Sequence, residues 1–110
     1  MTDSILNTVK KKCQIPIDCD DFDDDLLVEI NSVFMIAMQI GFGDTAIVVN
    51  DDTKKWSDLG LSEDKLGFIK SYVCNKTKLK FDPPQNSTLL NSLQETIREL
   101  ESRINYETTN

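Results

Sequence analysis

The stretch LLVEINSVFMIAMQIG, residues 26–41, decides the fold, because its apolar side chains recur at helical spacing. Seven of them are three or four residues apart and cover about 140° of a helix surface. These seven are Leu26, Leu27, Ile30, Val33, Phe34, Ala37 and Met38. They predict one buried helix face, against which the rest of the chain packs.

The other side of this predicted helix is also apolar. Val28 and Met35 lie there seven residues apart, and Ile36 and Ile40 fill much of the flank. A helix that is apolar nearly all round is buried nearly all round. Two interpretations carry equal weight: the second side, with Val28, Met35 and Ile36, meets another subunit, or it contacts the domain's own loops.

Three further helices are predicted from capping residues and apolar spacing. The first spans about residues 3–13, the third follows Ser62 and ends before Pro83, and the fourth begins near Asn86. The fourth has a narrow seam of the kind found in bundles and coiled coils, made by Leu90, Leu93, Ile97, Leu100 and Ile104. A polar tail from about residue 106 is expected to fray. Residues 1–110 thus predict a single all-α domain, a small four-helix bundle.

A long loop, residues 42–61, joins the second and third predicted helices. Residues 46–49 are compatible with a short strand or extended segment. Trp56 either pins this loop to the core, which we favour, or anchors an interface, where tryptophan is enriched. Lys76 and Lys80 project within the apolar arc of the third helix. Either they reach solvent at its carbonyl end, or they pair with carboxylates of a neighbouring subunit.

Charge is unevenly distributed along the chain. The net charge is −7, and residues 1–64 hold fourteen acidic residues against five lysines. Residues 65–110 hold seven basic against five acidic residues. Tight DNA binding needs a basic stripe, which this sequence lacks. Lys10, Lys11 and Lys12 are expected to lie in solvent at the carbonyl end of the first helix.

The acidic run DCDDFDDD, residues 18–25, precedes the second helix. A calcium loop is excluded, because Phe22 stands at the fifth position and Asp23 at the sixth, where glycine is needed. The run is therefore predicted to cap and charge the N-terminus of that helix.

Catalytic chemistry is largely missing from the sequence. It has no histidine, which removes Ser–His and Cys–His pairs, imidazole metal ligands and histidine acid–base catalysis. It also lacks a glycine-rich phosphate loop. The odd cysteine number, Cys13, Cys19 and Cys74, indicates a reducing compartment, with Cys13 and Cys74 as packing thiols. We expect no enzyme activity, no metal site and no cofactor.

The location of the protein can also be anticipated. The first residues, MTDSILNTVKKK, place charge after the apolar residues, unlike a signal peptide. The longest unbroken apolar run, Val33–Met38, is far too short to span a membrane. These features predict a soluble intracellular product.

Five sequence features, in one order along the chain, resemble the small helical head–tail connector proteins of tailed bacteriophages. They are INSVFM at Ile30–Met35, Trp56, KSYV at Lys70–Val73, FDPP at Phe81–Pro84, and RELESRIN at Arg98–Asn105. The likeness covers nearly the whole chain, about residues 3–104.

The resemblance implies a structural virion protein. Such adaptors form a ring of about a dozen subunits beneath the portal of the DNA-filled head. They extend the DNA channel and contact a tail-side stopper or tail-completion protein. DNA would pass nearby without specific binding, and no membrane would be involved. The alternative is a small cytosolic helical adaptor or regulatory protein that forms a small closed oligomer, such as a dimer through the Leu90–Ile104 seam.

Overall fold

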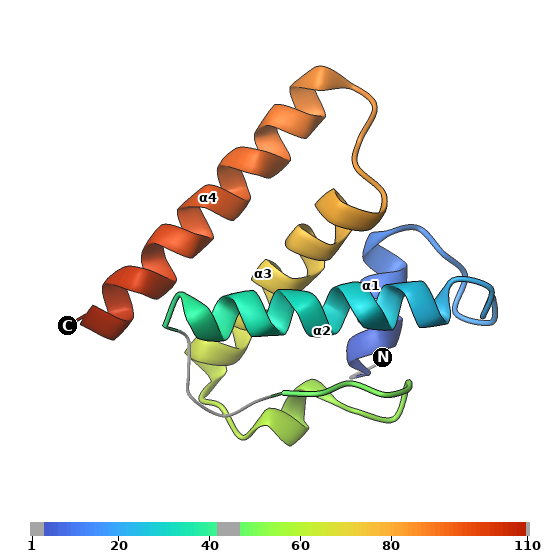
Figure 1. The fold of residues 1–110 in the computed structure, drawn as a ribbon, viewed down its shortest axis with the longest axis horizontal. Helices are drawn as coiled ribbons and strands as arrows, with labels where there is room; N and C mark the ends of the chain where they lie inside the picture. The colour runs from blue at the N-terminus through green and yellow to red at the C-terminus, as the bar shows by residue number, and fades with distance from the viewer. Residues whose placement is uncertain (1–3, 42–46, 110) are drawn as a thin grey trace.

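The computed structural model describes the backbone of residues 4–41 and 47–109, and side chains within these ranges as far as Arg103. The described part contains α1 (Ile5–Lys12), α2 (Asp23–Gln39), the 3-10 helix η1 (Trp56–Leu59), α3 (Glu63–Phe81) and α4 (Ser87–Thr109) (Figure 1). The predicted all-α fold with four helices is confirmed. Residues 47–49 form no strand, and Ala46 lies outside the described residues.

Three of the helix ends lie at residues that local chemistry favours. The Ser4 hydroxyl accepts the backbone N–H of Asn7 at the start of α1, and Ser62 caps α3 in the same way. Gly41, just after α2, has a φ of 108°, a conformation that favours glycine. The sequence step Gly41-Phe42-Gly43 predicts the end of this helix, but Phe42 and Gly43 lie outside the described residues. α4 remains helical to Thr109, beyond its expected end.

The N-terminus of α2 is charged but not capped by its acidic residues. Asp23, Asp24 and Asp25 occupy the first turn, where negative charge complements the helix dipole. However, the N-cap residue is Phe22, and no side chain caps the helix by a hydrogen bond. The prediction that the acidic run caps α2 is therefore wrong, because the helix begins within this run and not after it.

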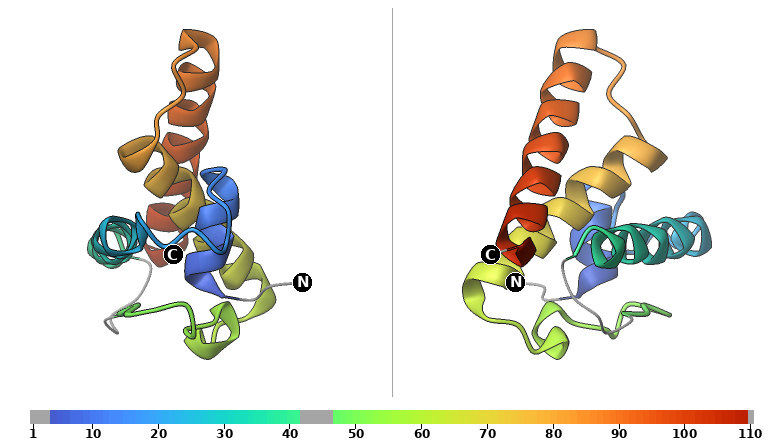
Figure 2. Two further views of the ribbon diagram at one scale, coloured as in Figure 1. Left: turned by 90° about the vertical axis from the view of Figure 1, so that its right-hand side faces the viewer. Right: turned by 60° about the vertical axis from the view of Figure 1, so that its left-hand side comes forward.

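The central helix of the fold is α3. It packs against α1, α2 and α4, and its buried residues point in several directions: Ile69, Tyr72, Val73, Cys74 and Thr77. Figure 2 (left) shows α2 along one side of the molecule and α1 with the first half of α3 on the other. The expectation that the chain packs around residues 26–41 is therefore wrong. Only one face of α2 is buried in the core, with Leu26, Ile30, Val33, Phe34 and Ala37.

Three contacts fasten the segment before α3 to the core. The Asn31 side chain donates to the carbonyl of Val49 at 3.0 Å and accepts its N–H at 2.7 Å. The backbone of Ile5 donates to the Lys54 carbonyl. Trp56 is 1% exposed. The prediction that Trp56 pins this segment to the core is confirmed.

The prediction that Lys10 lies in solvent is wrong. This lysine is 2% exposed, and its ammonium pairs with Asp23 at 2.7 Å and donates to the Ile17 carbonyl at 3.0 Å. Lys11 and Lys12 are exposed, as expected. Lys10 therefore ties the end of α1 to the segment that leads into α2.

Replacing Asp23 with alanine is expected to cost about 2–3 kcal/mol of unfolding free energy, because it leaves the buried ammonium of Lys10 without its carboxylate. Lys10→Met removes the charge and keeps most of the volume, so its expected cost is smaller, about 1 kcal/mol. Urea unfolding measures both. The matched control is Asp24→Ala, an exposed change in the same helical turn. Equal losses for the two aspartate variants would contradict the role assigned to the Lys10 ion pair.

Candidate interaction surface

The outward side of α2 exposes two large apolar side chains. Val28 is 66% exposed and Met35 is 63% exposed. The described part of the chain therefore does not cover them, which leaves the loop interpretation without support at these two positions. Asp24 and Asp25 are exposed one turn before Val28. Ile36 is only half-buried and packs against the core from the flank.

A neighbouring loop extends this apolar surface. Because Asn31 of α2 holds the backbone of Val49 by two hydrogen bonds, the adjacent Val48 lies beside the same helix. The Val48 side chain is 55% exposed. We call Val28, Met35 and Val48, together with Asp24 and Asp25, the α2 face.

Trp56, one of the candidate interface residues, is buried in the fold. Its indole N–H donates to the Thr8 hydroxyl at 3.1 Å, and its ring lies 6.4 Å from that of Phe34, centroid to centroid. With its side chain almost completely buried, Trp56 offers a partner no side-chain surface.

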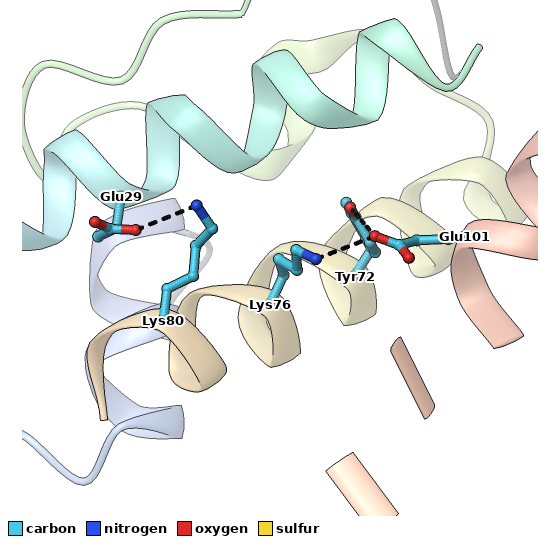
Figure 3. Close-up of polar contacts among 5 residues, drawn as sticks. All are labelled: Glu29, Tyr72, Lys76, Lys80 and Glu101. Atoms are coloured by element: carbon cyan, nitrogen blue, oxygen red, sulfur yellow. Dashed lines mark hydrogen bonds and ion pairs between the residues drawn. The ribbon is translucent and has the colours of Figure 1, made fainter. Parts of the chain in front are cut away.

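The lysines at 76 and 80 face carboxylates of their own chain (Figure 3). The ammonium of Lys76 lies 3.2 Å from Glu101 of α4, and that of Lys80 lies 3.9 Å from Glu29 of α2. Because α3 contacts both helices, Lys80 reaches α2 and Lys76, one turn away on α3, reaches α4. The presence of these two lysines within the apolar arc of α3 is therefore explained by ion pairs within one subunit.

Glu101 joins α4 to α3 through two residues, and sequence reasoning missed it. One of its oxygens accepts the Tyr72 hydroxyl at 2.8 Å and also pairs with Lys76. Burial, followed by this hydrogen bond, raises the pKa of Tyr72 well above its ordinary value. The sequence did hold one clue to this contact, because Glu101 lies one turn after Ile97 of the predicted apolar seam. Ile97 is 3% exposed in the structure.

The buried cysteines are poor nucleophiles. Burial raises the pKa of the Cys74 thiol to about 11, and the positive charges of Lys12 and Lys70 partly oppose that rise. Burial also raises the pKa of Cys13. Both thiols are therefore protonated at neutral pH, as packing thiols would be.

Thiol labelling at pH 8 is expected to separate the three cysteines. Cys19 is only half-buried, so it should react with a chromogenic disulfide reagent first. Cys13 and Cys74 should react at least about tenfold more slowly, because they are buried and protonated. Adding denaturant should make all three react quickly. Equal rates in the native protein would contradict the burial of Cys13 and Cys74.

Other classes of site find little support in the structure. Among the described side chains, those of residues 4–41 and 47–103, no group of three or more histidine, cysteine or acidic residues is arranged to hold a metal ion. Within the same residues, no helix combines the length and apolar character needed to cross a membrane.

The fold and its surface define a small all-α protein whose exposed apolar and acidic side chains suit contact with other proteins. A comparison with protein families matches residues 5–110 to the family described as phage connector protein. The chain therefore belongs to the phage connector protein family, and the resemblance noted in its sequence is confirmed. This membership gives it a structural connector role in a bacteriophage. No curated protein and no solved structure matched the chain.

Proposed function

We propose that this protein forms a ring of about a dozen copies beneath the portal and joins the DNA-filled head to the tail. The ring extends the DNA channel and presents its other end to a tail-side stopper or tail-completion protein. The protein is thus a virion component at the head–tail interface, assembled in the host cytoplasm, and it performs no catalysis.

The observation that carries this proposal is the α2 face. Two large apolar side chains, Val28 and Met35, are about two-thirds exposed on one helix, beside a third at Val48. Neighbouring exposed apolar side chains of this kind mark interaction sites. In a connector protein, the expected occupants are another copy of the chain or the portal.

The charge of the protein fits passage of DNA through such a ring. A net charge of −7 repels phosphate, so DNA moves through without adhering. Binding to double-stranded DNA should therefore be undetectable at physiological ionic strength.

The proposal is tested by mixing the purified protein with purified portal particles. The complex is separated by sedimentation and viewed by electron microscopy. The expected result is a ring of added density on one end of each portal. A protein that is monomeric alone agrees with the proposal if the portal acts as template, whereas failure to bind portal particles would refute it.

The alternative, a dimer through the seam of α4, is less well supported. The middle of that seam, at Ile97, is already buried where α4 packs on α3. A second chain would have to displace α3 to use it.

A further inference from the structure

The connection between α1 and α2, residues 13–22, presents apolar and acidic side chains that the α2 face does not include. Figure 1 shows it at the end of the molecule where α2 begins. Residues 16–19 and 20–23 each form a turn, in which the N–H of the last residue donates to the carbonyl of the first, at 3.0 Å and 3.3 Å respectively. The central pair of each turn combines one apolar and one acidic residue, and all four are exposed. They are Ile17 with Asp18, and Asp21 with Phe22.

The buried Lys10 holds both turns in place. Its ammonium donates to the carbonyl of Ile17 in the first turn and pairs with the carboxylate of Asp23, the last residue of the second turn. The two turns are therefore held side by side at one ammonium. The start of the connection is also fixed, because the Ile15 N–H donates to the Lys10 carbonyl at 2.8 Å. A surface with a fixed backbone loses little conformational entropy when a partner binds.

The aromatic ring of Phe22 is supported by α3. Its centroid lies 5.9 Å from that of Phe81, with the two rings in an edge-to-face arrangement, and Phe81 packs against the core. Nevertheless, Phe22 remains 45% exposed and Ile17 55% exposed. Exposed aromatic and apolar side chains on a rigid support are typical of interface anchors. We call Ile17, Asp18, Asp21, Phe22 and Phe81 the turn site.

The two aspartates of the turn site have no use within one subunit. Asp18 and Asp21 precede α2, so they lie outside its first turn, and neither caps the helix. Within the part of the chain that the structure describes, neither forms an ion pair. Carboxylates held close together repel one another, and a cationic partner relieves that repulsion.

The charge of the turn site indicates a partner other than a second copy. On the α2 face, Val28 follows Asp24 by one turn, so that apolar surface is itself acidic. The exposed Leu89 lies in the first turn of α4, which has no charged residue. Among the described residues, the exposed large apolar side chains thus offer no basic surface to match the turn site. The partner is therefore a different protein, whose contacting segment carries lysine or arginine beside an apolar side chain.

We propose that the turn site binds a segment of the portal in which an apolar side chain is flanked by lysine or arginine. The apolar side chain contacts Phe22 and Ile17, and the cationic groups pair with Asp18 and Asp21. This inference rests on the proposed ring, in which the portal is the partner on which each subunit assembles, and it names the surface of that contact.

Charge reversal tests the proposed pairing. The double variant Asp18→Lys, Asp21→Lys should bind purified portal particles at least about tenfold more weakly than the wild type, because like charges then meet. The neutral double variant Asp18→Asn, Asp21→Asn should also bind more weakly at low salt. Its affinity should fall less than that of the wild type between about 50 and 500 mM NaCl, because salt then screens fewer attractive contacts. Sedimentation with portal particles at both salt concentrations measures binding.

Matched controls keep the outcome specific. The double variant Asp52→Lys, Asp64→Lys changes the net charge equally at two exposed positions outside the turn site, so it should bind like the wild type. Phe22→Ser leaves the charge unchanged and should weaken binding, because it removes the apolar anchor. Thermal unfolding of every variant shows whether it is folded, and the substitutions at the exposed aspartates should change the unfolding temperature by only a few degrees.

The possible results separate this inference from the proposed function. If the wild type binds portal particles and both aspartate variants bind equally well with the same salt dependence, the turn site is not the portal surface and the connector ring stands. If these variants bind portal particles normally but lose binding to the tail-side protein, the partner is wrong and the inference is likewise overturned. If the wild type does not bind portal particles, the proposed function fails, and this inference fails with it.

Discussion

Met35→Lys is expected to prevent association of the protein while leaving the subunit folded. Because the Met35 side chain is 63% exposed, its replacement should change the unfolding free energy by no more than about 0.5 kcal/mol. In the proposed assembly the same position is covered, so an unpaired ammonium there should weaken binding by at least about 2 kcal/mol, or about thirtyfold. Sedimentation velocity with portal particles measures binding, and urea unfolding measures stability.

The control for this variant is Leu89→Lys. Leu89 of α4 is 60% exposed, similar to Met35, but it lies outside the α2 face. It should therefore retain assembly. If Met35→Lys unfolds the subunit, that side of α2 belongs to the core and our division of the helix is wrong. If both variants assemble normally, the α2 face is not an interface.

Trp56→Ala is expected to cause the largest loss of stability of any substitution considered, about 3–5 kcal/mol. The indole ring is 1% exposed, so its removal leaves a cavity between η1 and the core and abolishes the hydrogen bond to Thr8. A small domain has only about 5–15 kcal/mol of stability in total. The variant should therefore unfold at a much lower urea concentration, measured by far-ultraviolet circular dichroism.

Trp56→Phe separates the two contributions of the indole. Phenylalanine keeps much of the apolar volume but has no N–H donor, so its expected cost is smaller, about 1–2 kcal/mol. A loss below about 1 kcal/mol for the alanine variant would show that the segment before α3 is not anchored by this ring.

The sequence identified the exposed face of α2 only as a surplus of apolar residues. Val28 and Met35 stood opposite the buried face by helical periodicity alone, which is a local property. Whether a loop covered them depended on the path of residues 47–61. The Asn31–Val49 hydrogen bonds determine part of that path and leave Val48 exposed, and they join residues 18 positions apart.

The sequence by itself determined the four helices, the buried face of α2, the breaks near Gly41 and Pro83, and the family. These follow from apolar spacing, capping and backbone restrictions, which act over a few residues, and from an ordered set of motifs. Only the tertiary structure decided that α3 is central, that Lys10 is buried against Asp23, and that Lys76 pairs with Glu101. Each of these depends on which helix faces lie opposite one another, and a lysine in a helical sequence is compatible with either solvent or a distant carboxylate.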